Sequence, residues 1–93
     1  MDNPVKILIV DDDKNIRKTI LAILLDEGFK VDLAASGREA IRKTQDSTYN
    51  VALLDIKLPD MEGTELLSKI RETAPKMRKV MVTGFTTQEK TPF

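Results

Sequence analysis

The sequence predicts an α/β domain built on a parallel sheet that carries helices on both faces. Short apolar runs rich in β-branched residues alternate with longer segments in which apolar residues recur at helical spacing. Turn-forming and acidic residues separate the two kinds of segment. A strict alternation of strands and helices favours parallel pairing, because each helix carries the chain back to the edge where the previous strand began.

The first predicted strand is the nearly continuous apolar run 5–10, which is typical of a strand buried on both faces. A helix follows, because one apolar stripe recurs at intervals of three and four residues: Ile16, Ile20, Ile23 and Leu24. Asp13 can cap the free amides at the start of this helix. Gly28 is expected to end it.

The second predicted strand covers 31–35, where apolar and polar residues alternate, so it is expected at an edge of the sheet. Ser36 resembles a helix N-cap, and Glu39 stands at capping-box spacing from it. The helix that they open is predicted over about residues 37–45.

The third strand is predicted over 51–54 and stops at Asp55. A loop bracketed by Pro59 and Gly63 leads to a helix over 65–73, which should stop before Pro75. The fourth strand is the apolar run 80–82, which ends at Thr83.

Composition narrows the chemistry that is open to this chain. Its 93 residues suffice for one domain with a small core. The 15 Lys and Arg balance 15 Asp and Glu, which argues against direct nucleic-acid binding. The sequence has no Cys and no His, so carboxylates and hydroxyls are left for chemistry, and these suit hard cations such as Mg²⁺. No apolar run is long enough to cross a membrane and residues 1–6 do not resemble a signal peptide, so a cytoplasmic protein is expected.

Acidic residues end two of the apolar strands. Asp11 and Asp12 follow the first strand and Asp55 ends the third, so their carboxylates gather at one sheet edge if these strands are neighbours. A divalent cation would offset their repulsion, and one of them could act as a nucleophile toward phosphorus. The simpler interpretations are an N-cap for an aspartate at the helix start, a turn residue for Asp55 and an ordinary strand end for Thr83.

Three segments in order resemble the receiver domains of two-component response regulators. The segment 10–17 is similar to their opening, 53–63 to their phosphoacceptor segment, and 82–84 to their hydroxyl-bearing fourth strand. The resemblance implies that Asp55 accepts a phosphoryl group from a histidine kinase or a phosphotransfer protein. Thr83 would then bond that group, beside the small residue Gly84.

The same resemblance implies a Mg²⁺ site. Asp12, Asp55 and the backbone carbonyl of Lys57 would be ligands, and Asp11 would hold the ion through water. It also implies a flavodoxin-like doubly wound sheet, here shortened to about four strands in the order 2-1-3-4 with three main helices. Residues 1–93 would form a single receiver-like domain that lacks the fifth strand and the last helix. The lysine that ends the family's fifth strand has no counterpart in position, and Lys90 is the one candidate to replace it.

The sequence thus favours a stand-alone receiver that signals by binding a partner or by assembly, and that takes part in its own phosphotransfer without being an enzyme. An exposed fourth strand and an uncovered sheet face predict a homodimer or a higher homo-oligomer. The alternative is a pseudo-receiver that acts as a dimerisation or docking module without phosphorylation. A metal-dependent phosphatase with an aspartate nucleophile shares the carboxylates, but the chain has little room for a cap or a general acid.

Overall fold

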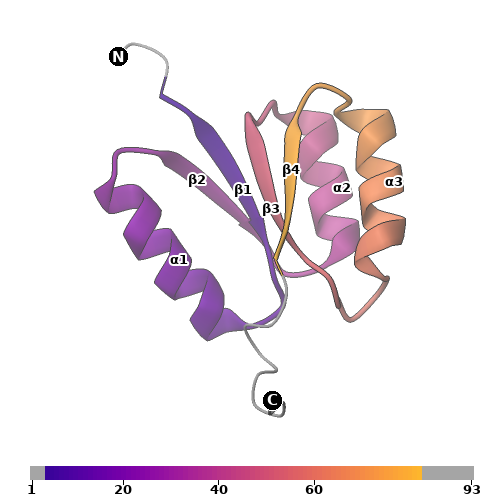
Figure 1. Ribbon diagram of the computed structural model, residues 1–93, viewed down its shortest axis with the longest axis horizontal. Helices are drawn as coiled ribbons and strands as arrows, with labels where there is room; N and C mark the ends of the chain where they lie inside the picture. The colour runs from indigo at the N-terminus through magenta and orange to yellow at the C-terminus, as the bar shows by residue number, and fades with distance from the viewer. Residues whose placement is uncertain (1–3, 83–93) are drawn as a thin grey trace.

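The computed structural model describes residues 4–82, in which strands and helices alternate along the chain (Figure 1). The elements are β1 (Lys6–Val10), α1 (Lys14–Asp26), β2 (Lys30–Ala34), α2 (Gly37–Asp46), β3 (Val51–Asp55), α3 (Gly63–Thr73) and β4 (Arg78–Val82). The predicted fold is confirmed within this range. No helix among these residues is both long and apolar enough to cross a membrane.

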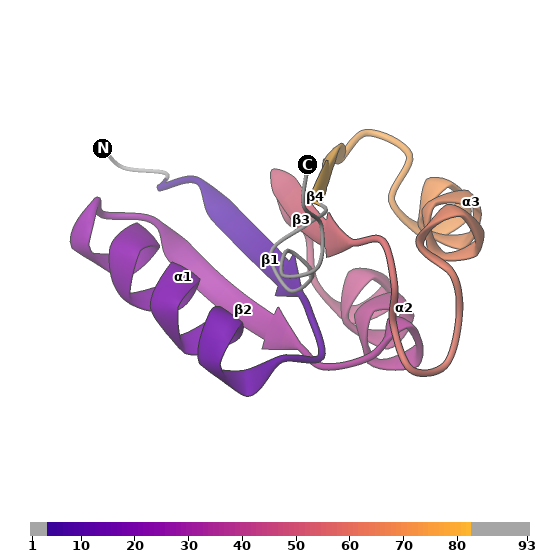
Figure 2. The same ribbon diagram turned by 60° about the horizontal axis from the view of Figure 1, so that its bottom comes forward.

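The four strands form one parallel sheet in the order β2-β1-β3-β4. Helix α1 lies on one face of the sheet, and α2 and α3 lie together on the other (Figures 1 and 2). The order confirms the prediction from the family resemblance, including the edge position of β2. It also makes β1 and β3 neighbours, with Val10 opposite Leu54, which decides where the acidic residues meet.

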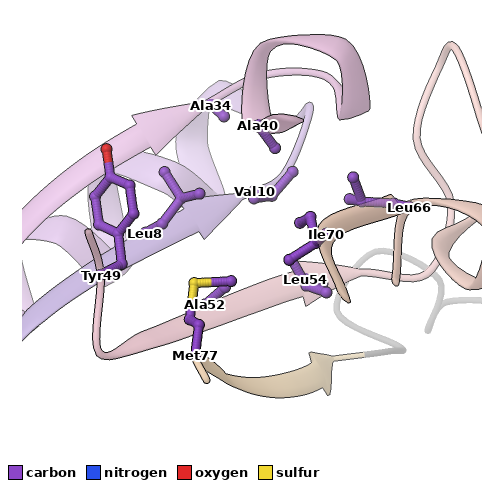
Figure 3. Packing of buried hydrophobic residues seen from close by; sticks show 10 residues of the cluster. All are labelled: Leu8, Val10, Ala34, Ala40, Tyr49, Ala52, Leu54, Leu66, Ile70 and Met77. Atoms are coloured by element: carbon purple, nitrogen blue, oxygen red, sulfur yellow. The ribbon is translucent and has the colours of Figure 1, made fainter. Parts of the chain in front are cut away.

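The main core lies between the sheet and the pair α2 and α3 (Figure 3). Leu8, Leu54, Leu66 and Ile70 are all fully buried there. Aliphatic side chains dominate this core, as the low aromatic content predicts, and Tyr49 is its buried aromatic member. The Tyr49 hydroxyl donates a hydrogen bond of 2.6 Å to Asp32 on β2, so its polar end is satisfied.

A matched pair of isoleucines tests this distribution of packing. Ile70→Ala is expected to lower the free energy of unfolding by about 2–5 kcal/mol, because the site is fully enclosed and a cavity remains. Ile23→Ala, also on a helix, should change it by no more than about 0.5 kcal/mol, because Ile23 is 57% exposed. Urea denaturation of both variants measures the difference. Equal losses would contradict the assignment of the core to the α2 and α3 face.

The opposite face of the sheet is less completely covered. Ile7 and Ile9 of β1 are buried, but no residue of α1 is. Ile23, a member of the apolar stripe that predicted α1, is mostly exposed. The reason is that α1 packs mainly on β2 and β1, and no described helix covers β3 and β4 on this face. Val80 of β4 is accordingly 47% exposed at the edge of the described sheet.

The element ends follow local hydrogen bonding. Asp13 caps α1 by accepting bonds from the amides of Asn15 and Ile16, as predicted. Ser36 caps α2 by accepting from the amide of Glu39. The Glu39 carboxylate instead accepts from the amide of Ala35, one residue before the position that a capping box uses.

Two elements begin earlier than their apolar patterns predict. Helix α3 starts at Gly63 rather than residue 65, and β4 starts at Arg78 rather than residue 80. In β4 the early start comes from backbone pairing, because the amide of Arg78 donates to the carbonyl of Asn50 at 3.0 Å. Such pairing does not require an apolar side chain, so the hydrophobic pattern does not predict it.

Candidate functional site

The carboxyl ends of β1 and β3 bring three carboxylates together. Asp11 and Asp12 follow β1 directly, and Asp55 is the last residue of β3. One carboxylate oxygen from each of the three lies within 4.8 Å of the other two. The prediction that these residues gather at one edge of the sheet is therefore confirmed, and it depends on the parallel pairing of two neighbouring strands.

The three aspartates differ in their surroundings. Asp11 is only 5% exposed, Asp55 is half-buried, and Asp12 is exposed. The start of α1 holds Asp11 in place. Its carboxylate accepts a 2.9 Å bond from the amide of Asp13, and its carbonyl accepts a 2.8 Å bond from the guanidinium of Arg17. The most buried carboxylate is thus also firmly positioned, while Asp12 faces solvent.

Asp55 lies at the entrance to a closed loop. Its carboxylate accepts a long bond, 3.3 Å, from the amide of Lys57, whose side chain is exposed. The loop closes where the amide of Gly63 donates to the carbonyl of Ile56 at 2.7 Å. A Cβ atom at Gly63 would lie 2.9 Å from two backbone atoms of Ile56, so only glycine allows this approach. This closure fixes the backbone that leaves the acidic cluster.

Burial and mutual repulsion disfavour the charged forms of two of these groups. Burial is the largest cause that raises the pKa of Asp11 above its usual value, and the charges of Asp55 and Asp12 add to it. Burial also raises the pKa of Asp55, with the charge of Asp12 as a further cause. In both residues a backbone N–H bond opposes the rise. A cation among the three carboxylates would relieve this repulsion.

The donor set fits a hard divalent cation. It consists of oxygen atoms alone, one side of it is open to solvent, and no Lys or Arg within residues 4–82 forms an ion pair with it. Oxygen donors of this kind suit Mg²⁺, Mn²⁺ or Ca²⁺. The role of the Lys57 carbonyl stays a prediction. Thr83, Gly84 and Lys90 lie outside the described residues, so their predicted roles stay predictions as well.

Asp60 supports the site in a way that sequence reasoning missed. Its two carboxylate oxygens accept bonds of 2.9 Å from the amides of Gly37 and Arg38, at the start of α2. The Gly37 amide is the largest cause that lowers the pKa of Asp60. The free amides in the first turn of α2 were the available signal, because Ser36 satisfies only one of them. Asp60 thereby ties the loop after Asp55 to a second helix.

Known proteins are similar to this chain in sequence. The chain is 42% identical to the regulatory protein VanRB of Enterococcus faecalis over 67 residues, which is 72% of this chain. It spans about 30% of the length of that relative and of similar curated relatives.

Solved structures agree in fold. A CheY-like response regulator receiver domain protein from Methanospirillum hungatei is 48% identical and superposes with a TM-score of 0.86, over 94% of this chain and 70% of that one. The response regulator TrrA of Thermotoga maritima, solved in complex with Mg²⁺ and beryllium fluoride, is 33% identical with a TM-score of 0.81. That match covers 88% of this chain and 71% of TrrA.

The family description "response regulator receiver domain" matches residues 7–92, nearly the whole chain. The match includes both strands that carry the carboxylates and the loop that follows Asp55. Together with the sheet order and the acidic cluster, it shows that this chain belongs to the response regulator receiver domain family.

Proposed function

We propose that this chain accepts a phosphoryl group on Asp55 from the phosphohistidine of a histidine kinase or a phosphotransfer protein. The observation that carries the proposal is the meeting of Asp11, Asp12 and Asp55 within 4.8 Å at the carboxyl edge of a receiver sheet. Asp55 is the member that is partly accessible and also held by the closed loop. It is therefore better suited than buried Asp11 or exposed Asp12 to act as a positioned nucleophile.

The transfer exchanges one bond to phosphorus for another. A carboxylate oxygen of Asp55 attacks phosphorus, an O–P bond forms, and the N–P bond to the donor imidazole breaks. The imidazole nitrogen keeps the electron pair, so the product is an acyl phosphate on Asp55 and a free histidine on the donor. Asp55 must be ionised to attack, and the lack of a described basic partner leaves a bound cation to offset the incoming charge.

Mg²⁺ is the cation that we assign to the site, and its charge would neutralise the phosphoryl oxygens. Asp12, Asp55 and the carbonyl of Lys57 would hold it directly, and Asp11 would hold it through water. The Mg²⁺ in the TrrA complex supports this assignment. Within the proposal, Thr83 donates a hydrogen bond to the phosphoryl group and Lys90 replaces the family lysine.

The test is intact-mass analysis after incubation with acetyl phosphate. The expected result is one phosphoryl adduct that forms with Mg²⁺, fails to form with EDTA and is released by hydroxylamine, as an acyl phosphate should be. A Lys90→Ala variant measures whether that residue takes part. Absence of an adduct, in protein whose circular dichroism shows a folded domain, would contradict the proposal.

We infer that the output passes through protein contacts, with assembly of this chain as the first candidate. Val80 on β4 is 47% exposed at the edge of the described sheet, and such an edge favours pairing with another strand. Sedimentation equilibrium should give a mass above the monomer that falls on dilution. A monomer mass at all concentrations would contradict a homo-oligomer.

The same exposed edge favours the second candidate, a docking module that works without phosphate. Intact-mass analysis and sedimentation equilibrium together distinguish the phosphorylated receiver from the docking module. Assembly that is unchanged in Asp55→Asn and without Mg²⁺, in protein that forms no adduct, would support the docking module. Assembly that changes with the adduct would support the phosphorylated receiver.

A further inference from the structure

A basic groove lies between α2 and α3, and none of the three clustered aspartates lines it. Its volume is about 430 Å³. Six residues line it: Arg38, Ile41, Arg42 and Gln45 from α2, Met61 from the loop before α3, and Lys69 from α3. The two helices run side by side on the same face of the sheet (Figures 1 and 2). The groove is thus a trough between two neighbouring helices.

The lining combines an apolar floor with a cationic rim. Ile41 and Met61 are partly buried and pack against the main core. Arg38, Arg42 and Lys69 are exposed. Within residues 4–82 the one ion pair joins Lys43 to Glu39, so the three rim cations have no anionic side chain bound to them.

One acidic residue beside this rim is already engaged. Asp60 lies close enough to Arg38 for their charges to interact, but both its carboxylate oxygens accept bonds from amides of α2. No acidic residue is among the six that line the groove. The groove therefore presents three positive charges around an apolar strip, and none of the three forms an ion pair within residues 4–82.

We propose that this groove docks an acidic amphipathic helix from a partner protein. Arg38 and Arg42 are four residues apart on α2, so they stand about 6 Å apart along its axis. Carboxylates at positions i and i+4 of a bound helix have the same spacing, and guanidinium groups pair well with carboxylates. Lys69 on the other wall would contact the opposite flank, while apolar side chains of the partner would cover Ile41 and Met61.

A helix fits the chemistry better than a nucleic acid or a membrane does. The chain has no net formal charge, and no aromatic residue lines the groove on which a base could stack. The apolar floor is recessed between two helices, which suits single side chains on a helix rather than a flat lipid surface. Charge complementarity on both walls then selects an acidic helix.

The groove shares a segment with the phosphoacceptor loop. Met61 follows Asp60, and a Cβ atom at Gly37 of α2 would meet the Met61 side chain at 2.6 Å. The docked helix would therefore touch the chain segment that leads back to Asp55. Any coupling between docking and phosphorylation rests on the proposed function, and it would be reciprocal. The docking itself does not depend on it.

A synthetic helical peptide with glutamates at i and i+4 and leucines on the adjacent stripe tests the docking. Isothermal titration calorimetry should show binding to the unphosphorylated protein. Arg42→Glu should weaken it about tenfold or more, because an attraction becomes a repulsion. Lys18→Glu on α1 makes the same change in net charge outside the groove, so it should leave binding unchanged. A peptide with serine in place of leucine should bind about tenfold more weakly or worse.

Several results would overturn the proposal. The first is that the acidic peptide fails to bind, and the second is that Arg42→Glu and Lys18→Glu weaken its binding equally. A third such result is that replacing leucine with serine in the peptide leaves its affinity unchanged. Binding to phosphatidylglycerol vesicles that Arg42→Glu abolishes, with no peptide binding, would assign the groove to a membrane instead. Circular dichroism of both variants is the control for retention of the fold. The binding experiment contains no phosphodonor, so absence of peptide binding is distinct from failure of phosphotransfer.

Discussion

Asp55→Asn should abolish the phosphoryl adduct that forms on the unchanged protein with acetyl phosphate and Mg²⁺. The amide that replaces the carboxylate has no negative charge and is a poor nucleophile toward phosphorus. Asp11 cannot take over, because it is 5% exposed and its carboxylate is bound to the amide of Asp13. Intact-mass spectrometry of the variant, under conditions that fully modify the unchanged protein, gives the answer directly.

Asp26→Asn is the matched control for that experiment. Asp26 is exposed at the end of α1, so the substitution changes the charge equally but away from the cluster. It should leave the adduct intact. An adduct that persists in Asp55→Asn would move the phosphoacceptor elsewhere, and peptide mapping after borohydride reduction would locate it.

The second large effect concerns Mg²⁺ binding. Mg²⁺ at about 100 times its Kd should raise the free energy of unfolding of the unchanged protein by about 2.7 kcal/mol, since the unfolded chain does not assemble the three carboxylates. Asp12→Asn should weaken Mg²⁺ binding at least about tenfold, because it removes a direct ligand. At the same Mg²⁺ concentration the stabilisation would then fall to about 1.4 kcal/mol or less.

Urea denaturation with and without Mg²⁺ measures this stabilisation in the unchanged protein and in Asp12→Asn. Asp26→Asn again serves as control and should keep the full stabilisation. Equal Mg²⁺ effects in Asp12→Asn and the unchanged protein would show that Asp12 is not a ligand. Absence of any Mg²⁺ effect would remove the cation from the site altogether.

Stability should also depend on pH through the carboxylate cluster. The pKa values of Asp11 and Asp55 are raised in the folded protein, so each group favours folding most below the ordinary aspartate pKa of about 3.9. That contribution is lost as the pH rises through the raised value. Without divalent cations, Asp55→Asn should therefore be more stable than the unchanged protein at pH 7, and this advantage should shrink at pH 4.

The difference between variant and unchanged protein separates the effect of the carboxylate cluster from that of Asp60. Asp60 titrates in the opposite sense, because its lowered pKa gives stability that is lost on acidification. Since both proteins contain Asp60, its contribution cancels. If Asp55→Asn is less stable than the unchanged protein at pH 7, the Asp55 carboxylate makes a favourable contact that exceeds the cost of burying its charge.

The sequence predicted the strands and the acidic cluster for one physical reason. Fully apolar runs identify buried strands, and parallel strands place their carboxyl ends at one edge. The sequence alone therefore predicts that Asp12 and Asp55, which are 43 positions apart, lie together. The strand order itself came from the resemblance of segments 10–17, 53–63 and 82–84 to receivers.

Features that are set by individual contacts between distant segments leave no signal in the hydrophobic periodicity. The bonds from Asp60 to the start of α2 join residues more than 20 positions apart, and no periodicity signals them. The early start of β4 at Arg78 is set by pairing with β3, not by side-chain character. The exposure of Ile23 depends on how much of the sheet α1 covers, which a helical stripe alone does not specify.

The unequal packing of the two faces has a consequence for motion. Helix α3 is anchored by fully buried Leu66 and Ile70, whereas α1 has no buried residue. Sub-global opening of α1 should thus need less free energy, and its amides should exchange with deuterium before those of α3. Asp13 and Arg17 of that helix start are also the residues that hold Asp11. Fraying of the first turn of α1 would therefore release one wall of the carboxylate cluster while β3 and Asp55 stay fixed.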